Sequence, residues 1–378
     1  MAMGGETGLM RRSFRETSRR IRRLFPRRGD PSPDGVASDS TVDGSPPTAF
    51  GGLGDGPDTR STETSEPLRR PQAGSEPDAA TDEADRPRPR RDAPPGPVRL
   101  VIADVDGTLV DGRGELSRTV QTACRRLLDH GIALILATAR SPRGVYRTQR
   151  ELTGVPLSIA CNGAIIWNRL AKRPLHHRPL EPELVREIVN VAREVEPEVM
   201  IGLEQLDGWH TDRWPRRIIS VLPDLTPPDS VRPLEALLGE PVTRLNLIAL
   251  PERMTAIRYA VSAAFWRTRR VSVFPGDRHL MQLTHPYADK AIAAQRIARR
   301  LQISGDEVMV IGDGPNDLGL FSWAGFSVAV ANACRPIRQA ADVIVASNDD
   351  HGAAEAIEKY ALAPAPGHSA GEPAEPAG

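Results

Sequence analysis

Asp104 and Asp106 are the strongest chemical signal in the sequence. They stand two positions apart and follow the apolar run Leu100-Val101-Ile102-Ala103, which is typical of a short buried strand. Gly107 then ends that strand. Two carboxylates at such a position can bind a hard cation and leave one oxygen free to attack an electrophile. The structural alternative is a solvated strand end, which needs only one polar residue.

Three other positions carry residues that suit the same chemistry. Thr138 directly follows an apolar run, Lys290 opens a predicted helix, and the loop 312–317 reads Gly-Asp-Gly-Pro-Asn-Asp after a predicted strand. The sequence has only three lysines beside 46 arginines, so a lysine retained at this place suggests a specific role. Taken singly, each feature also fits an ordinary helix-cap, first-turn or turn residue.

The elements that must position these residues follow an alternating pattern. Helical stretches, one of them capped by Ser117, separate several apolar runs. Strands that alternate with helices indicate an α/β fold with a doubly wound parallel-sheet core, whose ligands bind at the carboxyl ends of the strands. If the sheet is parallel, we expect Asp104, Asp106, Thr138 and the loop 312–317 to meet at one sheet edge. The predicted strands are 99–105, 132–137, 157–160, 307–311, 327–330 and 342–346.

The alternation stops between residues 166 and 285. That segment has strand-like runs of its own, 245–250 and 281–284, and a predicted helix at 181–194. It is long enough to form a separate small domain. We therefore expect a core made of residues 98–165 and 286–362, with an inserted α+β cap domain over its site. Substrate specificity is expected to lie in the cap.

The two ends of the chain have the composition of disordered tails. Residues 29–97 are mostly Pro, Gly, Ser, Thr, Asp and Arg, so the tail is predicted to span 1–97, and a second tail spans 363–378. Residues 9–25 combine an apolar stripe with many arginines and are expected to form a basic amphipathic helix, able to contact an anionic membrane surface or an acidic partner. A solvated tail, or a true start further downstream, explains this segment as well.

Composition limits the remaining classes. Residues 98–378 hold 33 acidic and 33 basic side chains, so we expect no nucleic acid partner. Cys124, Cys161 and Cys334 form no CxxC pair, which favours buried thiols in a reducing compartment. No run of 18 apolar residues and no secretory signal core is present, and we expect a cytoplasmic protein.

The motifs together resemble the haloacid dehalogenase-like hydrolase superfamily, in particular its Cof-type phosphatase branch. The resemblance covers about residues 98–360. It is carried by motifs that follow one another in order: DVDGTL at 104–109, TAR at 138–140, CNGA at 161–164, Lys290, GDGPND at 312–317, SVAVANA at 327–333 and ADVIVASNDDHG at 341–352.

The resemblance implies a Mg²⁺-dependent phosphatase of small phosphorylated metabolites that forms an aspartyl-phosphate. Asp104 would attack phosphorus, and Asp106 would protonate the leaving oxygen and then activate water. A dehalogenase has no use for that second acid. The other implied roles are phosphate binding by Thr138, Ala139, Asn162 and Asn316, charge neutralisation by Lys290, and Mg²⁺ binding by Asp104, the carbonyl of Asp106, Asp313 and Asp317.

Two other functions stay open at this point. A phosphomutase carries a similar DVDGTL motif, and a non-catalytic binding protein can use the same fold as a scaffold.

Ala139 departs from the family pattern, because glycine is usual at this position. A backbone donor needs no particular side chain, so activity should survive if the local dihedral angles accept alanine.

Overall fold

The computed structural model of the 378-residue chain describes residues 90–220, 226–265, 269–276 and 278–363. These residues belong to one of the two compact units of the chain. The predicted helix at 9–25 lies outside the described residues, as do both predicted tails except for 90–97 and residue 363.

The described residues contain an eight-stranded sheet with the order β14-β13-β12-β1-β2-β3-β4-β5. The six strands from β14 to β3 are parallel, and β4 and β5 are antiparallel additions at one edge. This arrangement confirms the predicted α/β class. The strands are β1 (Leu100–Ala103), β2 (Ala133–Ala137), β3 (Leu157–Ala160), β4 (Ile165–Asn168), β5 (Arg173–His177), β12 (Val308–Gly312), β13 (Phe326–Val330) and β14 (Val343–Val345).

The central strands are apolar along their whole length because both faces of the sheet are covered. Every residue of β1, β2 and β12 is buried. The register places Ala103 beside Leu136 of β2 and beside Ile311 of β12. The residues that follow these three strands therefore leave the sheet at one edge, where the sequence analysis expects the site.

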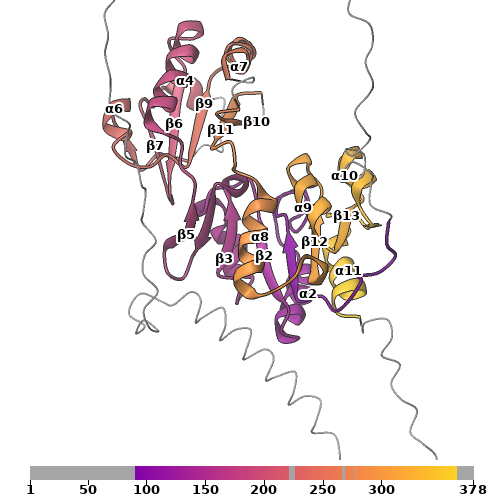
Figure 1. Ribbon diagram of the computed structural model, residues 1–378. Coiled ribbons are helices and arrows are strands. Elements are labelled where there is room, and N and C mark those ends of the chain that lie inside the picture. The colour runs from indigo at the N-terminus through magenta and orange to yellow at the C-terminus, as the bar shows by residue number, and fades with distance from the viewer. Residues whose placement is uncertain (1–89, 221–225, 266–268, 277, 364–378) are drawn as a thin grey trace, which may run out of the picture. The chain divides into compact units, whose positions relative to one another are not determined.

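The helices of the core form two layers (Figure 1). Helix α9 contacts both α8 and α10, and α11 contacts α2. The chain moves across the sheet in opposite directions from β1 to β2 and from β12 to β13, so right-handed crossovers place these layers on opposite faces. The helices are α2 (Arg118–Asp129), α3 (Tyr146–Glu151), α8 (Lys290–Leu301), α9 (Leu318–Trp323), α10 (Arg335–Ala340) and α11 (Gly352–Ala356), with short turns η1 (Arg143–Val145), η2 (Cys161–Gly163), η4 (Gly305–Glu307), η5 (Pro315–Asp317) and η6 (Ile357–Ala361).

Two of these helices begin at residues that cap them. The Ser117 hydroxyl accepts a hydrogen bond from the backbone N–H of Val120 at 3.2 Å, as the sequence predicts for α2. The Asp289 carboxylate accepts from the N–H of Ile292 at 2.9 Å and so fixes the start of α8. Lys290 is the first residue of that helix, and its position depends on this cap.

A second sheet has six strands in the order β10-β11-β9-β6-β7-β8. Helices α4 and α7 contact each other and form an apolar cluster with one face of this sheet (Figure 1). The elements are α4 (Pro182–Val195), β6 (Met200–Gln205), β7 (Gly208–Thr211), α5 (Arg216–Ile219), β8 (Ser230–Val231), α6 (Leu234–Leu237), β9 (Arg244–Ile248), α7 (Pro251–Phe265), β10 (Ser272–Pro275) and β11 (Leu280–Thr284).

The limits of the inserted segment differ in detail from the expected 166–285. Strands β4 and β5 pair with the larger sheet rather than with the six-stranded one. We therefore propose that the cap begins near residue 178. At the other end of the core, the backbone N–H of Arg91 donates to Asp342 at 3.1 Å. We propose that the core is not limited to residues from 98 onward and includes Arg91.

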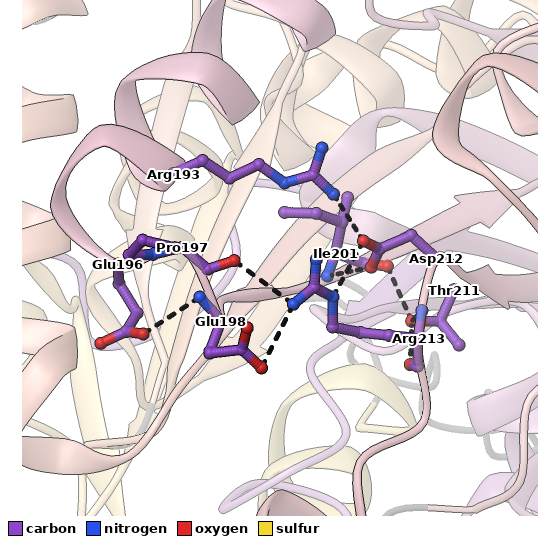
Figure 2. Close-up of polar contacts among 8 residues, drawn as sticks. All are labelled: Arg193, Glu196, Pro197, Glu198, Ile201, Thr211, Asp212 and Arg213. Atoms are coloured by element: carbon purple, nitrogen blue, oxygen red, sulfur yellow. Dashed lines mark hydrogen bonds and ion pairs between the residues drawn. The ribbon is translucent and has the colours of Figure 1, made fainter.

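A polar cluster joins α4 to the end of β7 (Figure 2). The Asp212 carboxylate has only 5% of its side chain exposed and accepts hydrogen bonds from Arg193, from Arg213 and from the backbone N–H of Ile201. Arg213 also forms an ion pair with Glu198 at 3.5 Å. Every carboxylate oxygen of Asp212 thus has a donor, and the cluster is a structural tie within the cap.

Candidate active site

Lys290 and two aspartates form the buried centre of the candidate site. The Lys290 ammonium donates to Asp104 Oδ1 and to Asp317 Oδ1, both at 2.7 Å, and only 1% of Lys290 is exposed. Asp104 follows β1, Lys290 begins α8, and Asp317 ends the turn η5 after β12. Three segments far apart in the sequence therefore bring one cation and two carboxylates together.

The loop after β12 supplies the third carboxylate. The Thr108 hydroxyl donates to Asp313 Oδ1 at 2.6 Å. Gly107 lies on the other side of Asp313 with φ +75°, and a Cβ at this glycine would come within 2.5 Å of Asp313 Oδ2. Only glycine tolerates both this φ and this approach. The DGT part of the motif thus holds the Asp313 side chain at the end of β1.

Ligand oxygens of Asp104, Asp313 and Asp317 lie within 4.8 Å of one another. Burial, together with the charges of Asp317 and Asp313, raises the pKa of Asp104 to about 8, although Lys290 opposes the shift. Burial raises the pKa of Asp313 too. Three carboxylates against one lysine leave an excess negative charge that a divalent cation bound by oxygens would neutralise. The donor set therefore fits a hard cation.

The Asp106 carboxylate does not belong to the acidic group formed by Asp104, Asp313 and Asp317. Its carboxylate pairs with the Arg140 guanidinium, with Arg140 Nε donating to Oδ2 at 2.8 Å and Nη2 donating to Oδ1. Just over half of the Asp106 side chain is exposed. Its predicted contribution to the metal is the main-chain carbonyl rather than the carboxylate, and this stays a prediction.

Thr138 lies fully buried at the end of β2. Its hydroxyl oxygen accepts a hydrogen bond from the backbone N–H of Arg140 at 3.0 Å, which leaves the hydroxyl proton for another acceptor. Its carbonyl accepts from the N–H of Asn162 at 3.1 Å, and the Asn162 side-chain oxygen accepts from Asn316 Nδ2 at 2.9 Å. Thr138, Asn162 and Asn316 are therefore linked directly.

The loop around Asn162 has an unusual backbone. Cys161, Asn162 and Gly163 have positive φ values of 49°, 55° and 98°. A Cβ on Gly163 would lie 2.2 Å from the backbone oxygen of Asp289, the residue that caps α8. Positive φ is costly for the two non-glycine residues, Cys161 and Asn162, and such strain is typical of functional sites. This turn packs directly against the segment that places Lys290.

All the residues predicted for the site thus lie in two adjoining groups. The first links Asp104, Lys290, Asp317, Asp313 and Thr108, and the second links Asn316, Asn162, Thr138, Arg140 and Asp106. Asn316 and Asp317 are consecutive and join the two groups. Ala139 belongs to the second group through the chain. The roles assigned to these residues remain proposals.

Sequence reasoning did not single out Thr108, Arg140 or Arg244 as site residues. Thr108 and Arg140 stand inside the DVDGTL and TAR motifs, so their place in those motifs was an available signal. Arg244 donates to the carbonyl of Ala139 from a position 105 residues away, and no local pattern marks it.

No helix in the part of the chain that the structure describes is long and apolar enough to cross a membrane. All three cysteines are free, with Cys124 and Cys161 buried. Burial raises the pKa of Cys124 to about 12, so this thiol stays protonated at neutral pH.

Residues 101–357 match the family described as haloacid dehalogenase-like hydrolase. The chain belongs to this family. The predicted family is therefore confirmed, and the protein is a hydrolase of the haloacid dehalogenase-like fold. The match covers the larger sheet, the inserted segment and all the predicted site residues.

Two curated relatives and one crystal structure are similar to this chain over nearly their own full length. The relative YxeH of Bacillus subtilis is 27% identical over 281 residues, which cover 70% of this chain and 99% of that protein. The 5-amino-6-(5-phospho-D-ribitylamino)uracil phosphatase YitU of the same organism is 25% identical and covers 69% of this chain and 97% of its own. A crystal structure of a haloacid dehalogenase-like hydrolase from Bacteroides thetaiotaomicron matches with a TM-score of 0.62 and 25% identity, covering 69% of this chain and 99% of that one.

Proposed function

We propose that this hydrolase is a Mg²⁺-dependent phosphatase that releases phosphate from a small phosphorylated metabolite through an aspartyl-phosphate on Asp104. The buried Asp104–Lys290–Asp317 group carries the proposal, because it holds a carboxylate nucleophile next to a fixed positive charge. The relatives are compatible with it, since YitU is named as a phosphatase of a phosphorylated metabolite.

Asp104 is the proposed nucleophile. Its carboxylate forms a bond to phosphorus while the bond from phosphorus to the leaving oxygen breaks. Lys290 keeps Asp104 in place and offsets the charge of the phosphoryl oxygens. Burial lowers the pKa of Lys290, but the two aspartates more than compensate and raise it, so the ammonium keeps its proton throughout.

Asp106 is the proposed proton carrier. It would donate a proton to the leaving oxygen and later accept one from the water that attacks the aspartyl-phosphate. In the structure, both of its oxygens accept hydrogen bonds from Arg140. Each carboxyl oxygen has a second lone pair, so Asp106 can carry a proton while Arg140 holds it in place.

The remaining residues are assigned to binding. Thr138 would donate its free hydroxyl proton to the phosphoryl group, together with the backbone N–H of Ala139, and Asn162 and Asn316 would border the same group. Asp104, Asp313 and the carbonyl of Asp106 would hold Mg²⁺, which supplies charge neutralisation at the phosphoryl oxygens when bound. Asp317 Oδ2 already accepts from the N–H groups of Asp313 and Gly314, so we assign Asp317 to orienting Lys290 and this loop.

The test is turnover of p-nitrophenyl phosphate with Mg²⁺ by the full chain and by Asp104→Asn. Asp129→Asn, which changes an exposed aspartate outside all of these motifs, is the control variant. We expect phosphate release by the wild type and the control, and at least a 10³-fold loss in Asp104→Asn, on the order of the loss of a covalent nucleophile. Equal turnover in the Asp104 variant would refute the proposal.

The same assay separates the two alternatives. A phosphomutase would release little phosphate and would need a bisphosphate activator. A non-catalytic binding protein would neither release phosphate nor form a fluoride-trapped phosphoryl mimic with Mg²⁺.

We also propose a cytoplasmic location, which the three free cysteines support because unpaired thiols are usual in reducing compartments.

A further inference from the structure

Arg244 is a buried arginine of the cap that reaches the phosphate-binding loop of the core. It lies on β9 with 5% of its surface exposed, and its Nη1 donates to the carbonyl oxygen of Ala139. Ala139 directly follows Thr138 and is the residue whose N–H is assigned to the phosphoryl group. The structure therefore shows a direct bond from the six-stranded sheet to the loop that would hold phosphate.

A carboxylate on the neighbouring strand fixes the arginine. Glu204 of β6 stands directly opposite Arg244 in the antiparallel pair, and Glu204 Oε1 accepts from Arg244 Nη2. Asn246 Nδ2 donates to the same oxygen at 3.3 Å. A guanidinium held in this way presents its remaining N–H groups in a fixed direction. Glu204 thus holds the Arg244 guanidinium in the orientation in which it contacts the core.

The same carboxylate makes a second contact with the core. The Cys161 thiol donates to Glu204 Oε2 at 3.4 Å. Burial raises the pKa of Cys161, so the thiol keeps the proton that it donates. The N–H of Cys161 donates to the carbonyl of Arg140 at 2.8 Å. One Arg–Glu pair of the cap therefore contacts both the Thr138 loop and the Asn162 turn.

Two further contacts join the cap to the residues just after this loop. Arg143 pairs with Asp229 at 2.8 Å, and the Tyr146 hydroxyl donates to Asp207 at 2.5 Å. These pairs are partly exposed and can open at modest cost. The Arg244–Glu204 pair is almost fully buried, so breaking its contact with Ala139 costs more than opening either of these two pairs.

We propose that Arg244 is a positioning residue, which links closure of the cap to the geometry of the phosphate-binding loop through the Ala139 carbonyl. Its bond fixes the peptide that follows Ala139 and so limits the direction of the preceding N–H donor. Arg244 acts on the phosphoryl site rather than on the leaving group. The expected effect of Arg244 on turnover rests on the proposed phosphatase function, whereas its expected effect on the order of the loop does not.

The kinetic test compares Arg244→Met with Arg186→Met, a surface arginine of α4 that pairs with Glu235. We expect Arg244→Met to lower kcat about 10²-fold, the effect of misplacing a catalytic group by about 1 Å. The loss should be the same on acetyl phosphate and on p-nitrophenyl phosphate, with Arg186→Met unchanged. A loss on p-nitrophenyl phosphate alone would overturn the proposal, because Arg244 would then recognise the leaving group.

A double variant distinguishes a loss of positioning from a loss of kcat that is caused by misfolding. Arg244→Met leaves Glu204 buried without its cation, whereas Arg244→Met with Glu204→Gln removes both charges together. We expect the double variant to regain most of the lost Tm and none of the lost kcat. Recovery of kcat together with Tm would show a purely structural role and overturn the proposal.

Hydrogen–deuterium exchange tests the positioning without any turnover. We expect peptides that cover residues 138–146 to exchange at least 10-fold faster in Arg244→Met and in the double variant than in the wild type or Arg186→Met. Unchanged exchange would overturn the proposal even in an active enzyme. If the wild type releases no phosphate but exchange increases as expected, the phosphatase function fails and the positioning contact stands.

Discussion

Replacing Lys290 with methionine removes the single cation that lies between Asp104 and Asp317. Both hydrogen bonds of the ammonium are 2.7 Å long, and the lysine is 1% exposed. Removing one partner of a buried ion pair costs about 3–5 kcal/mol, because the remaining charge stays buried without compensation. Asp317 then stays charged, whereas Asp104, whose pKa burial raises to about 8, takes up a proton, so we expect a cost of about 3 kcal/mol, at the lower end of that range.

The assay for this change is thermal unfolding at pH 7.5, with turnover measured in parallel. For a domain of roughly 150–250 residues, 1 kcal/mol corresponds to roughly 2–4 °C in Tm, so a cost of about 3 kcal/mol lowers Tm by about 6–12 °C. The loss of electrostatic stabilisation should lower kcat by at least about 10²-fold. Lys359→Met is the matched control, since Lys359 is exposed and lies far along the chain from the site.

Three outcomes of this experiment are informative. A large loss of both Tm and kcat in Lys290→Met, with Lys359→Met unchanged, supports the role given to the buried group. A lower Tm with normal kcat would leave Lys290 as a structural residue only. Unchanged Tm and kcat would refute the reasoning, because they would mean that the two aspartates do not depend on this lysine.

Other predictions follow from the same structure. The pKa of Asp104 is raised from 3.8 to about 8 in the folded state, so in metal-stripped protein its contribution to stability is full below about pH 4 and is lost as pH rises through 8. The increase in Tm on adding Mg²⁺ should therefore be larger at pH 8 than at pH 5.5. An equal increase at the two pH values would contradict the metal site. Asp212→Asn should lower the free energy of unfolding by about 2–3 kcal/mol in urea titrations and leave kcat unchanged, since it loosens a tie within the cap (Figure 2); a lower kcat would place Asp212 in the site. Gly163→Ala should lower both stability, by about 1–3 kcal/mol, and kcat, because its Cβ would collide with the backbone of Asp289; wild-type values would show that this turn is not constrained.

The sequence was sufficient to predict that the central residues of the candidate site lie close together. Asp104 follows the apolar run 100–103, Asp313 comes after the predicted strand 307–311, and the carboxyl ends of parallel strands meet at one edge. The Ser117 cap of α2 was predictable for a similar reason, because the residue types that cap helices act locally. The position of a side chain was therefore predictable wherever it lies at the end of its own helix or strand.

The parts that could not be predicted depend on contacts between distant residues. Asp106 and Arg140 are 34 positions apart, and no spacing rule reveals that they pair. The hairpin of β4 and β5 was placed in the insertion because the helix alternation ends there. It joins the larger sheet by antiparallel pairing, which needs no crossover helix and so leaves no such signal.

The covalent intermediate on Asp104 is the central claim, and trapping it is the most direct measurement. The full chain with Mg²⁺ is mixed with acetyl phosphate, quenched with acid, and reduced with borohydride, which converts an aspartyl-phosphate to homoserine. Mass spectrometry of the digest should then find homoserine at position 104. Homoserine at another aspartate, or phosphate release with none at 104, would contradict the account.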